Sequence, residues 1–299
     1  MSAPRQVLPH STYLITRRCA RRQLLIRPSA LINQIFLYCI AYAAKRTGVI
    51  CHAAAVISNH IHVVLSDPEG KLPEFMHWLF EHTAKCVNAS LGRWENLWSS
   101  EPPSAVRLET MEDIVDKIQY VWGNPAAAAL VSKAADWPGV ITGPEDYLKG
   151  PVEIERPKIF FRENGPTPPS VKLDIVPPPG IQGSTEDFAA MMAEELELRE
   201  WDIRHQHRLA GRPIMGKKAI LAQDPFEYPA GLEPRRNLNP RIAAKDKWRR
   251  IEAIGRLKEF LAAYREAWEE FKQGNRDVLF PVGSYWVVKH AGAACVLPE

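Results

Sequence analysis

The apolar residues of the first 125 positions alternate between runs that suit strands and spacings that suit helices. Ser29 fits a helix N-cap, and Thr47-Gly48 stops the helical spacing that follows it. Two apolar runs separated only by Ser58-Asn59 predict a hairpin of antiparallel strands. The predicted elements are, in chain order, a strand at 12–17, a helix at 29–47, strands at 49–57 and 60–65, a helix at 72–87, a strand at 104–108 and a helix at 110–122.

This order of elements predicts an α+β fold. We expect a mostly antiparallel sheet with the helices on one face, similar to ferredoxin-like (RRM-like) sandwiches. The third helix is expected to end at Gly123-Asn124-Pro125, because proline removes a helical hydrogen bond and disfavours helical geometry in the residue before it.

The composition of the sequence changes after Tyr147. Prolines crowd residues 151–180, which is typical of a stiff connector or a domain boundary. Ser184 to Asp187 resembles a capping box and opens a predicted helix. The remaining expectations are strand-like runs at 158–161 and 171–176, helices at 184–209 and about 241–274, and a division into a domain at 1–150, a connector at 151–180 and a mostly helical C-terminal region at 181–299.

The composition is ordinary for a folded, soluble protein, with 46% hydrophobic and 24% charged residues among 299. Residues 1–10 lack the apolar core of a signal peptide, and no apolar stretch is long enough to span a membrane, so we expect a cytoplasmic protein without a membrane partner. The five cysteines are scattered without a Cys-x-x-Cys pair and are expected to be free thiols.

The positive charge is local rather than global. The net charge is only +3, but no acidic residue precedes Asp67, and five arginines lie close together near the N-terminus. They are Arg17, Arg18, Arg21, Arg22 and Arg27. A basic surface of this kind attracts phosphates through counterion release. A merely solvated turn explains the cluster equally well when it is taken alone.

His60 and His62 are candidates for metal binding. Because side chains alternate along a strand, both imidazoles point to the same face of the sheet, where they can share one cation. A bare His-x-His pair is more often a surface feature without a metal. His205 and His207 have the same spacing, but on the predicted helix they diverge and cannot comfortably chelate one ion.

Tyr120 is a candidate nucleophile on the third helix. It lies about half a turn from the centre of the apolar stripe of that helix, so it is poorly placed as a core aromatic residue. Asn124 follows four residues later and emerges on the same helical face. The alternative for Tyr120 is an exposed surface tyrosine. Asp116 and Lys117 lie one turn before it, and we assign neither as a general base.

Taken together, these motifs resemble the single-tyrosine HUH transposases, and most closely the REP-associated tyrosine transposases. The resemblance is carried by residues 59–65, Asn-His-Ile-His-Val-Val-Leu, and by residues 120–125, Tyr-Val-Trp-Gly-Asn-Pro. Arg17-Arg18, Arg21-Arg22, Gly92-Arg93 and Leu97-Trp98 are also similar to the family and occur in the expected order. The resemblance covers roughly residues 10–140 and rests on the combination, because each motif alone is weak.

Two positions depart from the family pattern. Residues 126–131, Ala-Ala-Ala-Ala-Leu-Val, stand where a basic residue is usual, which puts a phosphate contact there in doubt. Gly123 stands where a larger residue is typical.

The resemblance implies an enzyme that cleaves and rejoins single-stranded DNA near hairpins. Tyr120 would form a 5′-phosphotyrosine intermediate, and His60, His62 and Asn124 would hold Mg²⁺ or Mn²⁺. The arginines at 17, 18, 21 and 22 would contact DNA, and the protein would be associated with the nucleoid. Whether two copies pair as a homodimer stays open.

Two other functions stay open at this point. One is a catalytically silent protein on the same fold that binds structured nucleic acid, and the other is an unrelated metal hydrolase that uses His60 and His62. The region 181–299 shows no trusted catalytic motif. Its basic residues at 235–258 could bind DNA, but a solvated helix face is at least as good an interpretation.

Overall fold

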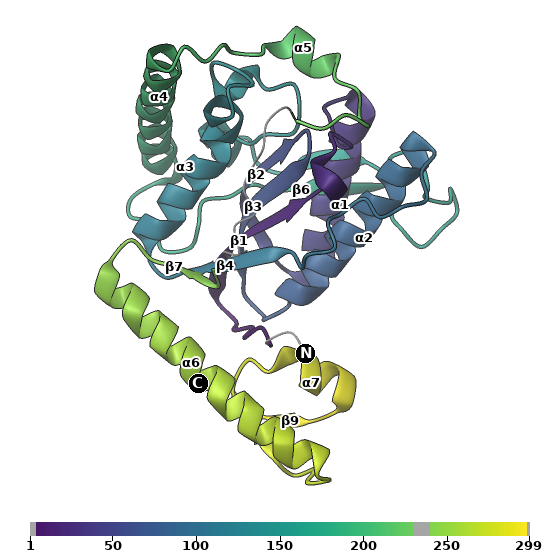
Figure 1. Cartoon of the computed structure of the whole chain (residues 1–299), viewed down its shortest axis with the longest axis vertical. Coiled ribbons are helices and arrows are strands. Elements are labelled where there is room, and N and C mark those ends of the chain that lie inside the picture. Colours follow the sequence, from purple (N-terminus) through teal and green to yellow (C-terminus); the bar gives the residue numbers. More distant parts are fainter. Residues whose placement is uncertain (1–3, 230–239, 298–299) are drawn as a thin grey trace.

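The computed structural model describes residues 4–229 and 240–297, so Arg235 and Arg236 of the basic stretch lie outside the described residues. Its centre is a five-stranded sheet in the order β2-β3-β1-β4-β7 (Figure 1). The strands are β1 (Ser11–Arg18), β2 (Ile50–Ile57), β3 (His60–Asp67), β4 (Ser104–Leu108) and β7 (Ile242–Ala243). Neighbouring strands are antiparallel except that β7 pairs parallel to β4. The predicted α+β class with a mostly antiparallel sheet is confirmed.

Helices cover both faces of this sheet. They are α1 (Ala30–Thr47), α2 (Leu72–Leu91) and α3 (Met111–Ala127). On β1, the Arg17 guanidinium lies over Phe80 of α2. The neighbouring Thr16 is hydrogen-bonded to His62, which in turn contacts Asn124 of α3. Successive residues of a strand face opposite ways, so α2 and α3 lie on opposite faces (Figure 1). The expectation of helices on one face is wrong, because Ile61 and Val64 bury apolar side chains on both faces of β3.

The ends of α1 follow the sequence signals. Ser29 Oγ accepts a hydrogen bond from the Ile32 amide, and Gly48 ends the helix in a left-handed conformation with φ of 73°. This conformation is open to glycine without a steric penalty.

The third helix does not end before Pro125 but continues through it to Ala127. Proline lacks an amide hydrogen, so residue 125 cannot donate the helical hydrogen bond to the carbonyl four residues earlier. The turn is closed by amides beyond the proline: Ala128 donates to the Asn124 carbonyl and Leu130 to the Pro125 carbonyl. Asn124 therefore keeps helical geometry, one turn after Tyr120.

The region expected as a connector contains a hairpin. β5 (Val152–Glu155) pairs with β6 (Ser170–Leu173), and β6 packs against α1. The run at 158–161 is not a strand, and the run at 171–176 is a strand only up to Leu173. Val171, Leu173 and Ile175 are buried in the same hydrophobic core as the sheet. The division into a domain at 1–150 and a connector at 151–180 stays a prediction. Residues from both sides of position 150 belong to one hydrophobic core.

The second half is mostly helical among its described residues. It contains α4 (Thr185–Leu209), α5 (Lys217–Leu221), α6 (Lys247–Lys272), β8 (Leu279–Phe280), α7 (Tyr285–Ala291) and β9 (Ala294–Cys295). The last helix predicted from residue 241 begins only at Lys247, because residues 242–243 pair with β4. Phe271, Phe280 and Val287 form a small separate core with the end of α6. In residues 4–229 and 240–297, no helix is long and apolar enough to cross a membrane.

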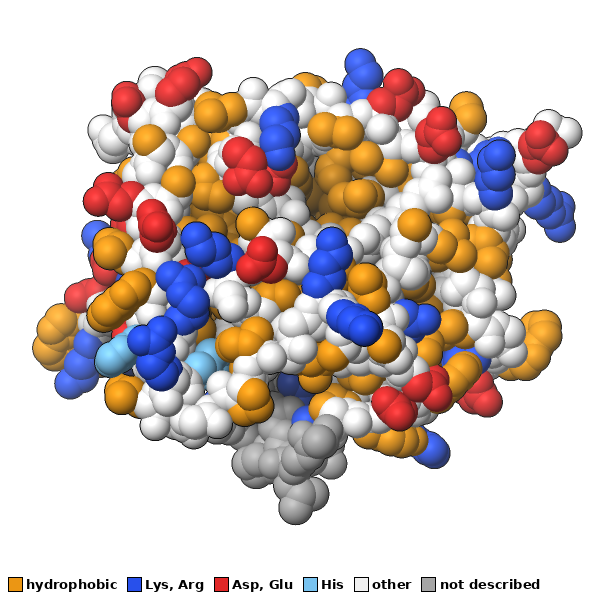
Figure 2. Space-filling model, turned by 90° about the horizontal axis from the view of Figure 1, so that it is seen from above, with side chains coloured by type: hydrophobic (Ala, Val, Ile, Leu, Met, Phe, Trp, Pro, Cys, Tyr) orange, Lys and Arg blue, Asp and Glu red, His pale blue; other side chains and the backbone are white. Residues whose placement is uncertain are grey.

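The segment around α5 returns to the tip of the β2–β3 hairpin. Ser58 Oγ donates to Gln223 Oε1, and the Leu24 amide donates to the Glu227 carbonyl. Figure 2 looks onto this end of the molecule and shows a hollow lined by hydrophobic side chains, with Lys and Arg side chains at several places around it.

His52 lies in a buried polar chain at the irregular position of β2, between the paired residues Cys51 and Ala53. Its Nδ1 is 2.8 Å from the Val176 carbonyl oxygen, and its Nε2 is 2.8 Å from Ser66 Oγ. Burial is the largest effect on this imidazole and lowers the pKa of His52 to about 4. The neutral ring therefore links β2 to residues after β6.

We expect the free energy of unfolding to fall as pH is lowered from about 6.5 to about 4. In this window the unfolded chain protonates His52 while the folded chain does not, so stability present above pH 6.5 is lost toward pH 4. At about 1.4 kcal/mol per pH unit, the loss is about 3 kcal/mol. Urea unfolding of wild type and His52→Asn at pH 7 and pH 4.5 measures it. An equal loss in the variant would contradict this assignment.

Candidate active site

β3 presents His60 and His62 on the sheet face that carries α3. The two rings have centroids 4.8 Å apart and are nearly perpendicular, at 83°. In the register of the sheet, His62 pairs with Thr16 and His60 pairs with Arg18 of β1. The predicted hairpin and the same-face placement of the two histidines are therefore found in the structure.

Each imidazole is oriented through its Nδ1 atom. His62 Nδ1 is 2.8 Å from Thr16 Oγ1, and His60 Nδ1 is 2.7 Å from Asn59 Oδ1. An amide oxygen can only accept, so His60 Nδ1 carries the proton and its lone pair is on Nε2. On His62, Asn124 Nδ2 lies 3.3 Å from Nε2, and an amide NH₂ can only donate, so His62 also carries its proton on Nδ1. Both Nε2 atoms thus carry the lone pair of their ring, the state in which an imidazole can bind a cation.

α3 brings Tyr120 and Asn124 to the histidines. The Tyr120 ring lies against the His62 ring with centroids 5.3 Å apart, and 37% of Tyr120 is exposed. Asn124 reaches His62 Nε2 and also hydrogen-bonds Tyr120. The structure therefore places His60, His62, Tyr120 and Asn124 together in one copy of the chain.

Burial shifts the pKa values of His62 and Tyr120 in opposite directions. Burial, and then the His60 ring and the Arg18 guanidinium, hold the pKa of His62 well below its ordinary value, so this ring is neutral at pH 7. Burial raises the pKa of the Tyr120 phenol, and this effect exceeds the opposing effects of Asn124, Arg18 and Arg199. The phenol is therefore protonated at neutral pH and must lose its proton when it reacts.

The four arginines expected to contact DNA do not lie on one surface, because Arg17 and Arg18 point to opposite faces of β1. Arg18 is exposed on the histidine face, and its charge acts on both His62 and Tyr120. Arg17 faces the other way, with its guanidinium 4.8 Å from the Phe80 ring centroid and 5.6 Å from that of Trp98. Arg21 and Arg22 follow with φ of 52° and 64° in the turn after β1. The structure thus brings Arg18 to the histidines and separates Arg17 from them.

Asp116 and Lys117 are engaged with each other rather than with Tyr120. Lys117 Nζ is 2.8 Å from Asp116 Oδ2, and Arg199 and Lys245 also approach this carboxylate, at 3.8 and 3.6 Å. They form part of an ion network between α3 and later segments, in line with their omission as a general base.

α4 explains the unusual glycine of the tyrosine helix. A Cβ atom at Gly123 would lie 3.4 Å from Arg199 Nε and 3.7 Å from Ile203 Cδ1. Gln119, one turn earlier, donates to the Met192 carbonyl of α4. A side chain larger than alanine at position 123 would therefore meet the Arg199 and Ile203 side chains of α4. On α4 itself, His207 Nε2 meets the Ala126 carbonyl and His205 stacks on Trp201, so this second His-x-His pair diverges as expected.

Three residues beside the site were not singled out from the sequence. Thr16 orients His62 and could have been suspected only once the strand register was known, whereas Asn59 orients His60, its neighbour in the sequence. Trp94 is 98% exposed in the loop after α2. This loop is held beside the end of β1, because the Ala20 amide donates to the Leu97 carbonyl and the Ser99 amide to the Arg18 carbonyl.

The residues present fit a single divalent cation. Within the two described ranges, no three or more His, Cys, Asp or Glu side chains gather in a way that could hold a metal ion. The donors are two imidazoles and one amide, a set that suits Mn²⁺ and tolerates Mg²⁺. Neighbouring ligands about 2.1 Å from an octahedral ion lie about 3 Å apart. The 3.3 Å between His62 Nε2 and the Asn124 amide nitrogen is close to this value, and turning the amide exchanges that nitrogen for Oδ1.

Comparison with known proteins gives distant structural neighbours. A REP-associated tyrosine transposase bound to a REP hairpin aligns with a TM-score of 0.41 and 17% identity, over 48% of this chain and 82% of that chain. A protein of Deinococcus radiodurans R1 described as a transposase aligns with a TM-score of 0.29 and 19% identity, over 40% of this chain and 92% of that one. No family model and no curated protein matches the sequence. Because both likenesses are distant, the function proposed below rests on the side-chain geometry.

Proposed function

We propose that the chain cleaves and rejoins single-stranded DNA through a covalent link to Tyr120. The observation that carries this proposal is the seating of an accessible tyrosine against His62, with His60 and Asn124 beside it. A surface tyrosine without a catalytic role has no need of two oriented imidazoles and an amide next to its ring. A hydrolase that activates water has no need of the tyrosine.

The reaction is a transesterification at phosphorus. The Tyr120 oxygen forms a bond to phosphorus, the bond from phosphorus to the 3′ oxygen breaks, and the strand leaves with a free 3′-OH. The phenol proton passes to solvent, and the departing 3′ oxygen takes up a proton. The phosphodiester energy is kept in the 5′-phosphotyrosine, so attack by another 3′-OH rejoins a strand without ATP.

The chain's own residues have separate parts in this reaction. Thr16 and Asn59 fix the histidine rings, and Arg18 favours both the phenolate form of Tyr120 and a phosphate beside it. His60, His62 and Asn124 would hold Mg²⁺ or Mn²⁺, which when bound would supply Lewis-acid stabilisation of the negative charge on the scissile phosphate.

The DNA is proposed to be unpaired where it is cut and to lie next to a hairpin. Tyr120 sits on a helix fixed by the sheet and by α4, so the strand must bend to meet it in line. Trp94 offers an exposed indole, on which an unpaired base can stack, in the loop that is bonded through Ser99 to the Arg18 carbonyl.

Trp94→Ala is expected to weaken binding of a single-stranded oligonucleotide about tenfold, because stacking of one base contributes about 1–3 kcal/mol. Fluorescence anisotropy with a labelled oligonucleotide measures this change. Trp248→Ala is the matched control, since it removes another exposed indole, from α6. Equal affinities for the two variants would remove Trp94 from the proposed strand path.

Covalent capture tests the proposal as a whole. A hairpin-flanked single-stranded oligonucleotide, labelled in turn at its 5′ and 3′ ends, is incubated with the full chain and Mn²⁺ and run on a denaturing gel. The 3′ label should stay on the protein while the 5′ label leaves on a fragment with a free 3′-OH. Cleavage without an adduct would favour the hydrolase, and binding without cleavage would favour the silent nucleic-acid-binding protein.

A further inference from the structure

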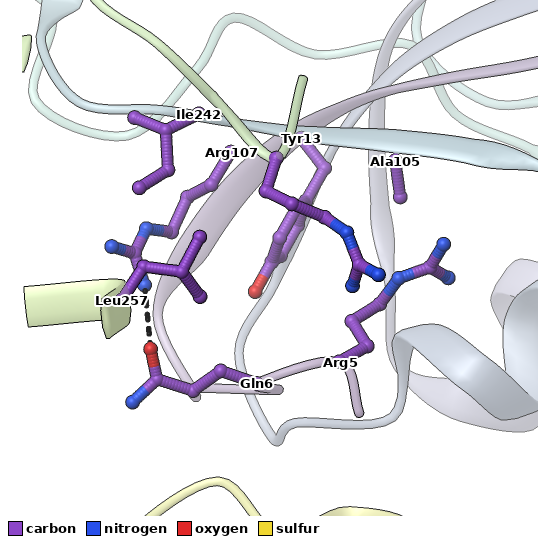
Figure 3. A pocket seen from close by; sticks show the side chains of 8 residues that line it. Arg5, Gln6, Tyr13, Ala105, Arg107, Ile242 and Leu257 are labelled. Carbon is purple, nitrogen blue, oxygen red and sulfur yellow. Dashed lines mark hydrogen bonds between the residues drawn. The ribbon is translucent and has the colours of Figure 1, made fainter. Parts of the chain in front are cut away.

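Segments of the second half contact the sheet at two places. At the edge formed by β7, Ile242 and Leu257 of α6 line a small pocket together with Tyr13 of β1 (Figure 3). Tyr13 faces away from the histidines, since it lies three residues before Thr16 on β1 and side chains of a strand alternate. The other place is the tip of the β2–β3 hairpin, which leads directly into His60. The second contact therefore borders the candidate site.

The hairpin tip packs against a turn of uncommon backbone geometry. Arg21 and Arg22, which follow β1, have φ of 52° and 64°. Residues other than glycine rarely adopt a positive φ, and two in succession persist only where the surrounding structure fixes them. The turn presents the Arg22 carbonyl to the hairpin, where this carbonyl accepts a hydrogen bond from Asn59 Nδ2 at 3.1 Å.

The Arg22 carbonyl decides which way the Asn59 amide points. A carbonyl oxygen can only accept, so it faces the NH₂ end of the amide, and the oxygen end is left to face the neighbouring ring. Asn59 Oδ1 is 2.7 Å from His60 Nδ1, which is therefore the protonated nitrogen of that ring. If the amide were turned end for end, its NH₂ group would face Nδ1 and favour the tautomer with the proton on Nε2. The position of one backbone carbonyl thus selects the His60 tautomer.

The second half holds this turn and the hairpin tip together. Three hydrogen bonds of 2.8 to 3.1 Å join the segment 223–227 to them: the Leu24 amide to the Glu227 carbonyl, Gln23 Nε2 to the Phe226 carbonyl, and Ser58 Oγ to Gln223 Oε1. The first two fix the residues that follow the turn, and the third fixes the residue that precedes Asn59. The segment therefore keeps the Arg22 carbonyl and the Asn59 amide at bonding distance.

We propose that the segment 223–227 selects the tautomer of His60 through the Arg22 carbonyl and the Asn59 amide. Asn59 and Gln223 are positioning residues in this relay. When the segment is docked, His60 carries its lone pair on Nε2; when it is displaced, the amide is free to turn and some molecules carry the proton there instead. The consequence for cation binding rests on the proposed function, in which His60 is a ligand. The second half would then control the site without touching the cation.

The tautomer is measured in the metal-free full chain by proton–nitrogen correlation NMR of the histidine rings, at a pH where His60 is neutral. Wild type should show the Nδ1–H pattern alone. Gln23→Ala combined with Gln223→Ala removes the two side-chain bonds of the segment, and should lower the ratio of the Nδ1–H to the Nε2–H form about tenfold, since each lost bond weakens the preference severalfold. Gln206→Ala is the matched control, because its hydrogen bond stays within α4.

Asn59→Asp, added to the double variant, should restore the Nδ1–H pattern, because a carboxylate offers only acceptors to the ring and does not need the Arg22 carbonyl. A hairpin so loosened that residue 59 no longer reaches His60 would not be rescued. Gln23→Ala alone removes an exposed bond and should show a smaller shift in the same direction, even if the double variant does not fold. The Gln206→Ala pattern in both the single and the double variant, or the Nε2–H pattern in wild type, would overturn the proposal.

Calorimetric titration with Mn²⁺ tests the consequence for the cation separately. The apparent affinity should fall in proportion to the fraction of molecules in the Nδ1–H form, because only this fraction is competent to bind. A changed tautomer with unchanged Mn²⁺ affinity would support the relay and contradict His60 as a ligand in the proposed function. An unchanged tautomer would overturn the relay whatever the Mn²⁺ affinity is.

Discussion

Tyr120→Phe is expected to abolish covalent capture of DNA and to lower the cleavage rate by on the order of 10⁴-fold or more, as removal of a catalytic nucleophile does. The variant loses only the phenol oxygen, and its ring can keep the edge-on contact with His62. Affinity for the oligonucleotide should therefore stay within about twofold of wild type. Single-turnover cleavage with Mn²⁺ and a denaturing gel for the adduct measure the two effects.

Tyr228→Phe is the control for this variant, because Tyr228 is an exposed tyrosine of the second half. It should form the adduct at the wild-type rate. Cleavage that persists in Tyr120→Phe would mean that water is the nucleophile and would turn the proposal toward a metal hydrolase.

His62→Ala is expected to lose metal-dependent cleavage together with Mn²⁺ binding. In the proposed metal site His62 is the central donor, since Asn124 is 3.3 Å from its Nε2 and the His60 ring centroid is 4.8 Å from its own. Loss of a direct ligand should lower Mn²⁺ affinity by about 100-fold or more, since even a residue that only orients a ligand costs about 10–100-fold. Calorimetric titration with Mn²⁺ and cleavage over a series of Mn²⁺ concentrations measure the loss.

His205→Ala supplies the comparison, because it removes a histidine with the same His-x-His spacing from α4. It should bind Mn²⁺ and cleave as wild type does. If His62→Ala titrates with Mn²⁺ like His205→Ala, the ion is not held at this site.

The sequence was informative wherever a local rule decides the structure. Ser29 and Gly48 bound α1 as predicted, and the two residues of the hairpin tip put His60 and His62 on one face. Tyr120 could be separated from the core stripe of α3 because helical periodicity is a local property.

The remainder depends on which distant segments meet. The prediction that α3 ends at Asn124 was wrong, because amides after Pro125 complete its last turn. The role of Thr16 follows from its register with His62, which no local pattern specifies. The pairing of residues 242–243 with β4 and the close approach of α4 at Gly123 are likewise long-range contacts. For the same reason, the sequence alone does not show that Arg17 and Arg18 face different helices. Arg17 lies over Phe80 of α2, whereas Arg18 lies on the face that carries the histidines and α3.

The clamping of α3 by α4 also bears on how broken strands would be exchanged. Gln119 and Gly123, which are one turn apart on α3, both contact α4, and the helix is seated on the sheet beneath. A helix held on two sides is a fixed anchor, so a DNA end attached to it stays in place while the incoming 3′ end has to travel. Since one copy supplies every group of the site, the rate of the first cut per molecule should not change on dilution.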